Sequence, residues 1–116
     1  MRVISQDGTM DVPYETGSFN MICAELVESK RTNIYYHHSS IGVAIKIAEY
    51  STEAKAIKAM EMLREQYGKL EVMKVLASGT AEYMEKALAT DVMIKHYNTY
   101  CDMNVFQFPQ DDEIEV

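Results

Sequence analysis

The chain has 116 residues, of which 47% are apolar and 25% charged, and its formal net charge is −7 at neutral pH. This length and composition predict a single ordinary globular domain that is large enough to bury its own core. No apolar run is long enough to cross a bilayer, and the net negative charge argues against direct binding of DNA or RNA.

The N-terminal segment predicts a β-hairpin. Asp7-Gly8 stands between two short apolar segments, and such a pair is the usual sequence of a tight two-residue type I′ turn, which needs positive φ at both central residues. Pro13 cannot donate a ladder hydrogen bond, so the second strand should end there or lie at a sheet edge. No charged segment followed by a long apolar run is present, so we predict no secretion signal and expect the fold to begin at residue 1.

Three further strands are expected before residue 51. Residues 19–26 are apolar on both faces, which is typical of a central or sandwiched strand. Residues 34–38 are rich in aromatic strand formers. Val43, Ile45 and Ile47 alternate with residues 44, 46 and 48, which predicts a half-buried strand.

The second half of the chain predicts helices. Ser51 or Thr52 is a suitable N-cap, and residues 57, 60, 63 and 67 recur at helical spacing up to Gly68, a typical residue at a helix C-terminus. A short helix over 70–77 and a third from Thr80 to about Tyr97 should follow. Residues 105–108 return to strand character, and the acidic segment 111–116 should fray unless it is docked.

These elements predict an α+β fold: a small antiparallel sheet, made of the N-terminal hairpin and meander plus the C-terminal strand, with a helix packed on one face and an added C-terminal helical segment. We expect a single domain over residues 1–116. Residues 1–50 should be mainly β, 51–67 the core helix, 68–104 the added helical segment, and 105–116 the strand and acidic tail.

The sequence contains no catalytic motif. No glycine-framed serine or phosphate-cradling glycine loop is present, so we expect no enzyme activity, no catalytic residues and no cofactor. His37 and His38 are neighbours on a predicted strand and should point to opposite faces, which disfavours a shared metal ion. Cys23 and Cys101 lie among apolar residues without a CxxC pair, which indicates free thiols in a reducing cytoplasm.

Two segments are candidates for binding. In the first, aromatic rings would stack on a nucleotide base while a basic side chain meets a phosphate; its residues are Lys30, Arg31, Tyr35, Tyr36, His37 and His38. The alternative is that these tyrosines simply fill a half-buried sheet. In the second, Asp111, Asp112 and Glu113 would offer carboxylates to a basic partner, or form a solvated surface. Met62 and Met93 are candidates for a homo-oligomer contact.

Three segments together resemble a known group of proteins: MRVISQDG with the following Pro13-Tyr14, EYSTE (49–53) with AMEML (59–63), and VFQFPQDDE (105–113). They are similar to those of small uncharacterised proteins encoded by phages and prophages of Gram-positive gut bacteria. This chain departs from the group at Ala54, where a Glu often completes a capping box with Ser51, and over 68–104, which is longer than usual.

The resemblance implies a cytoplasmic protein that acts by binding. The first hypothesis is an anti-defence inhibitor, similar to an anti-CRISPR protein, whose acidic surface occupies the basic groove of a host immune effector. The alternative is a sponge that sequesters a cyclic nucleotide or related immune messenger without cleaving it. A structural or regulatory phage protein without a defence role is a third hypothesis. Direct nucleic-acid binding and membrane association are not expected.

Overall fold

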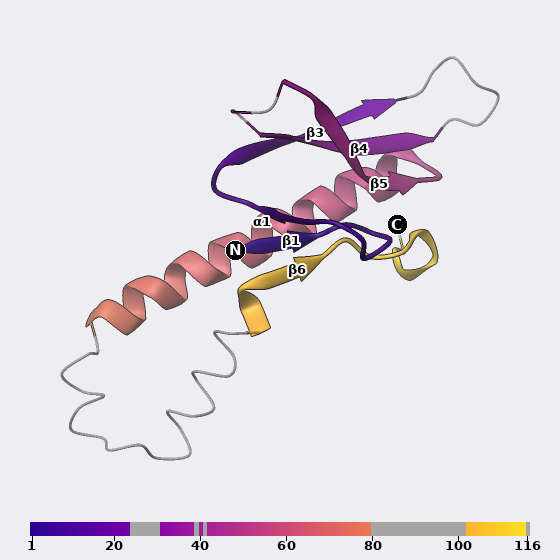
Figure 1. Ribbon diagram of the computed structural model, residues 1–116. Coiled ribbons are helices and arrows are strands. Elements are labelled where there is room, and N and C mark those ends of the chain that lie inside the picture. Colours follow the sequence, from indigo (N-terminus) through magenta and orange to yellow (C-terminus); the bar gives the residue numbers. More distant parts are fainter. Residues whose placement is uncertain (24–30, 39, 41, 80–101, 116) are drawn as a thin grey trace.

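The computed structural model describes residues 1–23, 31–38, 40, 42–79 and 102–115. The described residues form strands that are followed by one long helix and then by a last strand and a 3₁₀ turn (Figure 1). In chain order the elements are β1 (Arg2–Ile4), β2 (Asp11–Pro13), β3 (Gly17–Cys23), β4 (Thr32–His38), β5 (Ala44–Tyr50), α1 (Glu53–Gly79), β6 (Val105–Gln107) and the 3₁₀ helix η1 (Asp111–Glu113). The predicted α+β class is confirmed, whereas the helix predicted from Thr80 lies outside the described residues.

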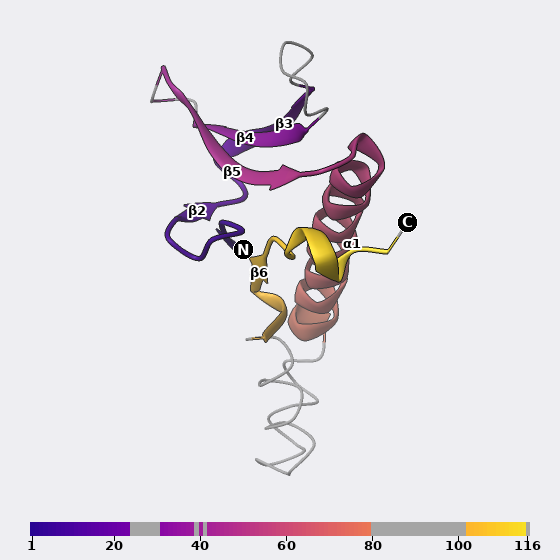
Figure 2. The ribbon, with the colours of Figure 1, turned by 90° about the vertical axis from the view of Figure 1, so that its right-hand side faces the viewer.

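The strands form two three-stranded sheets instead of one. The first has the order β2-β1-β6 and the second the order β3-β4-β5. The second sheet is the expected antiparallel meander, but β6 pairs with β1 in parallel, with Phe106 opposite Val3. Parallel strands need a long connection, which the chain between β1 and β6 supplies. Helix α1 runs alongside both sheets (Figure 2) and contacts β4 and β5.

Helix α1 continues beyond its predicted end. It spans 27 residues, so the predicted termination at Gly68 and the separate helix from Leu70 are wrong. The buried positions run on past the glycine, because Ala56, Leu63 and Leu70 recur at multiples of seven residues and are all less than 2% exposed. Burying Leu70 offsets the roughly 0.5–1 kcal/mol that a mid-helix glycine costs. The helix begins as predicted at an N-cap, where the Thr52 hydroxyl accepts the Lys55 N–H at 3.2 Å. In the described part of the chain, no helix is both long enough and apolar enough to cross a membrane.

The hairpin between β1 and β2 forms, but its turn differs from the predicted one. The Gly8 N–H donates to the Ser5 carbonyl at 2.9 Å, so Gln6 and Asp7 are the central residues, and Gly8 follows them with φ of 76°. The turn is held by the Asp7 carboxylate, which accepts hydrogen bonds from the Ser5 hydroxyl at 2.6 Å and from the Thr9 hydroxyl at 2.7 Å. These bonds lower the pKa of Asp7 to about 2.

The positions of β3 and β5 also correct the sequence prediction. The strand expected over residues 19–26 is described from Gly17 to Cys23 and lies at a sheet edge, with Ile22 54% exposed, so the prediction of a central strand is wrong. Residues 24–26 and the side chain of Cys23 lie outside the described residues. In β5 the predicted alternation breaks at Ile47, an extra residue between the Ala48–Ile34 and Lys46–Tyr35 pairs, and both Ile47 and Ala48 are buried.

The core forms around Tyr36, which is only 2% exposed. Its ring lies 5.1 Å from that of Phe19, centroid to centroid, and its hydroxyl donates to the Pro13 carbonyl at 2.8 Å. A Cβ atom at Gly17 would overlap the Tyr36 ring. Because only glycine leaves room for the ring, Gly17 allows β3 to pass directly over Tyr36.

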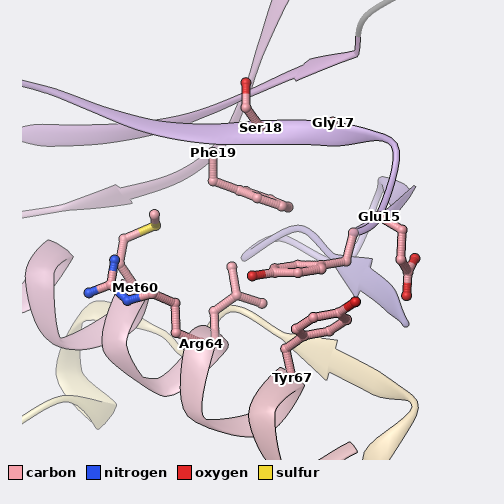
Figure 3. Close-up of a pocket in the computed structure, with 9 residues that line it drawn as sticks. Glu15, Gly17, Ser18, Phe19, Met60, Arg64 and Tyr67 are labelled. Carbon is pink, nitrogen blue, oxygen red and sulfur yellow. The ribbon is translucent and has the colours of Figure 1, made fainter. Parts of the chain in front are cut away.

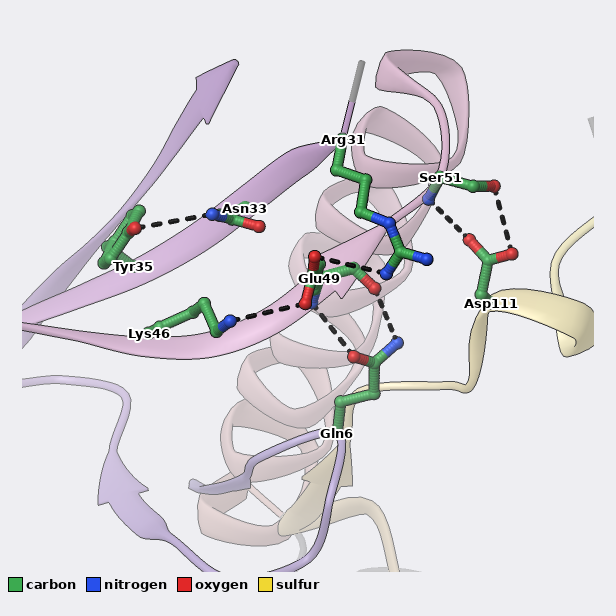
Figure 4. A network of polar contacts seen from close by, with 8 residues as sticks. All are labelled: Gln6, Arg31, Asn33, Tyr35, Lys46, Glu49, Ser51 and Asp111. Atoms are coloured by element: carbon green, nitrogen blue, oxygen red, sulfur yellow. Dashed lines mark hydrogen bonds and ion pairs between the residues drawn. The ribbon is translucent and has the colours of Figure 1, made fainter. Parts of the chain in front are cut away.

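Gln6 connects the two sheets and the C-terminal segment, and Figure 4 shows its side chain against Glu49 of β5. Its backbone N–H donates to the Ile47 carbonyl at 2.9 Å, and its side-chain oxygen accepts the Glu49 N–H at 2.9 Å. The side-chain amide group donates to the carbonyls of Glu49 at 3.0 Å and Pro109 at 3.2 Å. The turn after β1 therefore pairs with the outer edge of β5 in place of another strand.

We expect Gly68→Ala to stabilise the protein by roughly 0.5–1 kcal/mol, because Gly68 is exposed inside α1 and a Cβ there meets no atom within 4 Å. Chemical denaturation with circular dichroism measures the change. The matched substitution Gly8→Ala should destabilise the protein instead, because Gly8 has a φ of 76°. A destabilising Gly68→Ala would contradict a continuous helix through this position.

Candidate functional site

The predicted ligand-binding residues of β4 are divided between the two faces of the sheet. Tyr36 and His38 share the core-facing side, and Tyr35 and His37 share the outer side, as the strand alternation predicted. Burial of Tyr36 and its hydrogen bond to Pro13 use both the ring and the hydroxyl, so the prediction that Tyr36 stacks on a ligand is wrong. Lys30 lies outside the described residues.

Arg31 is engaged by an acidic neighbour. Its guanidinium lies 3.2 Å from the Glu49 carboxylate, which also accepts a hydrogen bond from Lys46 at 3.3 Å (Figure 4). Partial burial raises the pKa of Glu49, but the hydrogen bonds from Arg31 and Lys46 outweigh this effect and the net shift is downward. The described members of the predicted set are therefore not gathered into a pocket with a free cation.

The histidines have separate surroundings. His37 is exposed on the outer face, and the His38 ring nitrogen Nδ1 lies 2.6 Å from the Ser40 hydroxyl. Within the ranges that the structure describes, no three His, Cys, Asp or Glu side chains are placed to hold a metal ion.

The described part of the acidic segment, residues 111–115, is docked against the start of α1. The Asp111 carboxylate accepts hydrogen bonds from the Ser51 backbone N–H at 2.7 Å and from the Ser51 hydroxyl at 3.0 Å (Figure 4), and it pairs with Lys55 at 3.1 Å. Tyr50 donates to the Pro109 carbonyl at 2.8 Å, and Ile114 is 5% exposed. Burial raises the pKa of the Tyr50 hydroxyl, and the charges of Asp111 and Glu113 add to this effect.

The docked segment presents a group of carboxylates that we call the acidic end: Asp111, Asp112, Glu113 and Glu115. Asp112, Glu113 and Glu115 are exposed, and no ion pair joins them to another described residue. Of the three predicted partner-binding residues, Asp111 therefore anchors the segment, while Asp112 and Glu113 are available to a partner.

A cleft of about 400 Å³ lies between β3 and α1, at a place that the sequence analysis did not identify (Figure 3). We call it the aromatic cleft, and it is lined by Tyr14, Glu15, Gly17, Ser18, Phe19, Met60, Leu63, Arg64 and Tyr67. The Tyr14 ring lies 4.1 Å from the Tyr67 ring and 5.8 Å from the Phe19 ring, measured between centroids. Aromatic faces in a concave site are suited to a planar ligand.

Two charged side chains, Glu15 and Arg64, line the aromatic cleft. Glu15 accepts a hydrogen bond from the N-terminal ammonium group of Met1, which lowers the pKa of the carboxyl. Arg64 is exposed and forms no ion pair with any residue that the structure describes. The cleft therefore combines aromatic rings with an arginine that has no ion-pair partner in the part of the chain that the structure describes.

The sequence held only a partial signal for this cleft. Met60, Arg64 and Tyr67 stand at the i, i+4, i+7 spacing of one helix face. That spacing cannot show that Tyr14 and Phe19 would cross over the same face, because this depends on the path of the chain between β2 and β3.

Of the two methionines predicted to form a homo-oligomer contact, Met62 is 36% exposed on α1, and Met93 lies outside the described residues.

Comparisons with known proteins gave no match to a family model, to a curated protein or to a solved structure.

We expect the stability that Asp111 contributes to depend on pH. The Ser51 N–H and the Lys55 ammonium hold the pKa of Asp111 below its ordinary value, against a smaller opposing effect of burial. Because the folded-state pKa is depressed, this stabilisation is complete above the unfolded value of about 3.9 and is lost as the pH falls through the folded value. Asp111→Asn should therefore unfold at lower denaturant than the control Asp112→Asn at pH 7, and the difference should narrow below about pH 4. If the denaturant midpoints of the two variants differed by the same amount at pH 7 and at pH 2.5, this role of Asp111 would be contradicted.

Proposed function

We propose that the chain is a binding protein without catalysis, and that its acidic end occupies a basic groove of a protein partner. The observation that carries this proposal is that Asp112, Glu113 and Glu115 are exposed, form no ion pair with any described residue, and lie on a segment that Asp111 holds in place. The resemblance to phage and prophage proteins supports a host defence effector as the partner, with the chain acting as an anti-defence inhibitor.

The physical basis is competition for the same cations. A groove that binds nucleic acid is lined by Lys and Arg, and their attraction to phosphates is long-ranged and weakened by salt. Carboxylates fixed on a docked segment meet such a groove without a large loss of chain entropy, which favours binding over a freely moving acidic tail. Complementary charge also accelerates the encounter of the two proteins.

Two variants with the same change in net charge test the proposal. Asp112→Asn with Glu113→Gln neutralises two carboxylates of the acidic end, whereas Glu61→Gln with Glu65→Gln neutralises two exposed carboxylates on α1. Bacterial strains that each carry one nucleic-acid-dependent defence system are prepared with and without expression of the chain. Each strain is then infected with a phage that its defence system blocks. For the system that the wild type suppresses, the purified effector is then tested for displacement of fluorescent duplex DNA.

The acidic-end variant should lose about 10-fold or more in inhibitory potency at low salt, and the α1 variant about 2-fold or less. Raising the salt concentration should weaken inhibition by the wild type. Equal losses in the two variants, inhibition that does not depend on salt, or suppression of no defence system would contradict the proposal.

A second candidate function uses the aromatic cleft. Its volume of about 400 Å³ and Arg64, which pairs with no acidic residue that the structure describes, favour a ligand with a planar ring and an anionic group, such as one unit of a nucleotide messenger. The chain would then be a sponge that holds the messenger without cleaving it. This moves the predicted phosphate contact from Arg31, which is paired with Glu49, to Arg64.

Matched arginine substitutions test this second function. The protein is incubated with cyclic mononucleotides, cyclic dinucleotides and ADP-ribose derivatives, and the ligand released by heat is identified by mass spectrometry. Arg64→Met should reduce retention about 10-fold, the effect of losing one charge-assisted contact, and Arg31→Met should leave it unchanged. Loss in Arg31→Met alone would return the site to β4, and release of a cleaved product or of no ligand would contradict a sponge.

A further inference from the structure

Strand β3 is an edge strand whose outer side is unpaired within the described ranges. The second sheet has the order β3-β4-β5, so β3 and β5 are its two edges. Gln6 covers the β5 edge by pairing with the backbone of Ile47 and Glu49. No described residue pairs with the β3 edge in the same way. Among the described residues, the β5 edge of this sheet is thus covered and the β3 edge is open.

The composition of β3 lacks the features that protect edge strands from association. Such strands are normally short, charged, bulged or interrupted by proline, because their free N–H and C=O groups can pair with another strand. Strand β3 has seven residues, GSFNMIC, with no charge and no proline. Met21 is 39% exposed and Ile22 is 54% exposed.

We propose that β3 pairs with β3 of a second copy of this chain, antiparallel and about a two-fold axis at Asn20. This joins the two sheets into one six-stranded sheet. A second copy suits this edge because β3 carries no charged residue, and because the symmetric register places Ile22 opposite Ser18 and Met21 opposite Phe19 of the partner copy. No like charges meet along this strand, and each exposed apolar side chain gains a neighbour.

The net charge of −7 on each copy opposes this association, so salt should strengthen it. The opposite dependence is expected for the acidic end and a basic partner, whose attraction salt weakens. The two kinds of binding can therefore be distinguished in the same buffers.

Sedimentation velocity on the full chain, at about 1–200 µM protein with a reducing agent and at two salt concentrations, tests the proposal. Asn20→Lys places two like charges directly opposite each other at the two-fold axis and should weaken the dimer at least about 10-fold. Val43→Lys introduces the same charge at a residue that is 66% exposed just before β5, and should leave the dimer unchanged. Circular dichroism checks that both variants keep the fold.

A symmetric cross-link provides an independent measurement. In a Cys23→Ser, Cys101→Ser background, Asn20→Cys should form a disulfide-linked dimer on mild oxidation, because antiparallel pairing about residue 20 brings the two side chains together. Val43→Cys should not. A wild type that is monomeric at 200 µM, a dimer that Asn20→Lys leaves intact, or equal cross-linking of both cysteine variants would overturn the proposal.

Discussion

The side-chain amide of Gln6 is the contact on which the arrangement of this protein depends. The residue lies in the turn after β1, pairs with the backbone of β5, and donates a further hydrogen bond to Pro109 in the C-terminal segment. Three parts of the chain that are far apart in sequence therefore meet at one side chain. Because an amide has both a donor and an acceptor, it satisfies the Glu49 N–H and C=O together, which no shorter or singly polar side chain would do.

The functional proposals follow from this contact. The Gln6 bond to Pro109 and the Tyr50 bond to the same carbonyl bring the C-terminal segment to the start of α1. There Asp111 meets Ser51 and Lys55, and the remaining carboxylates face outward. A segment that its composition would leave as a solvated tail thus becomes a fixed negative surface. The aromatic cleft forms where Tyr14, which follows β2, packs against Tyr67 of α1.

The sequence predicted what local patterns determine. The alternation of residues 34–38 and an N-cap at Ser51 or Thr52 are local, and the structure confirms the first and places the cap at Thr52. The helix end predicted at Gly68 is wrong because the burial of Leu70, a tertiary effect, outweighs the weak local preference of glycine for ending a helix. Tyr36 looked available for a ligand because no pattern shows that Gly17 would let the chain cross its ring. The aromatic cleft and the Gln6 contacts join distant segments, and such contacts cannot be read from local spacing.

The most direct test of this account is amide hydrogen exchange in Gln6→Ala, compared with Gln107→Ala, which changes an exposed glutamine of β6. If Gln6 joins the three segments, its loss should accelerate exchange of the Ser51 and Phe108 amides as well as that of Glu49, by about 10-fold or more. The β3–β4 ladder should stay protected, and Gln107→Ala should change little. Acceleration confined to Glu49 would show that the segments are held independently of Gln6, and would contradict the account.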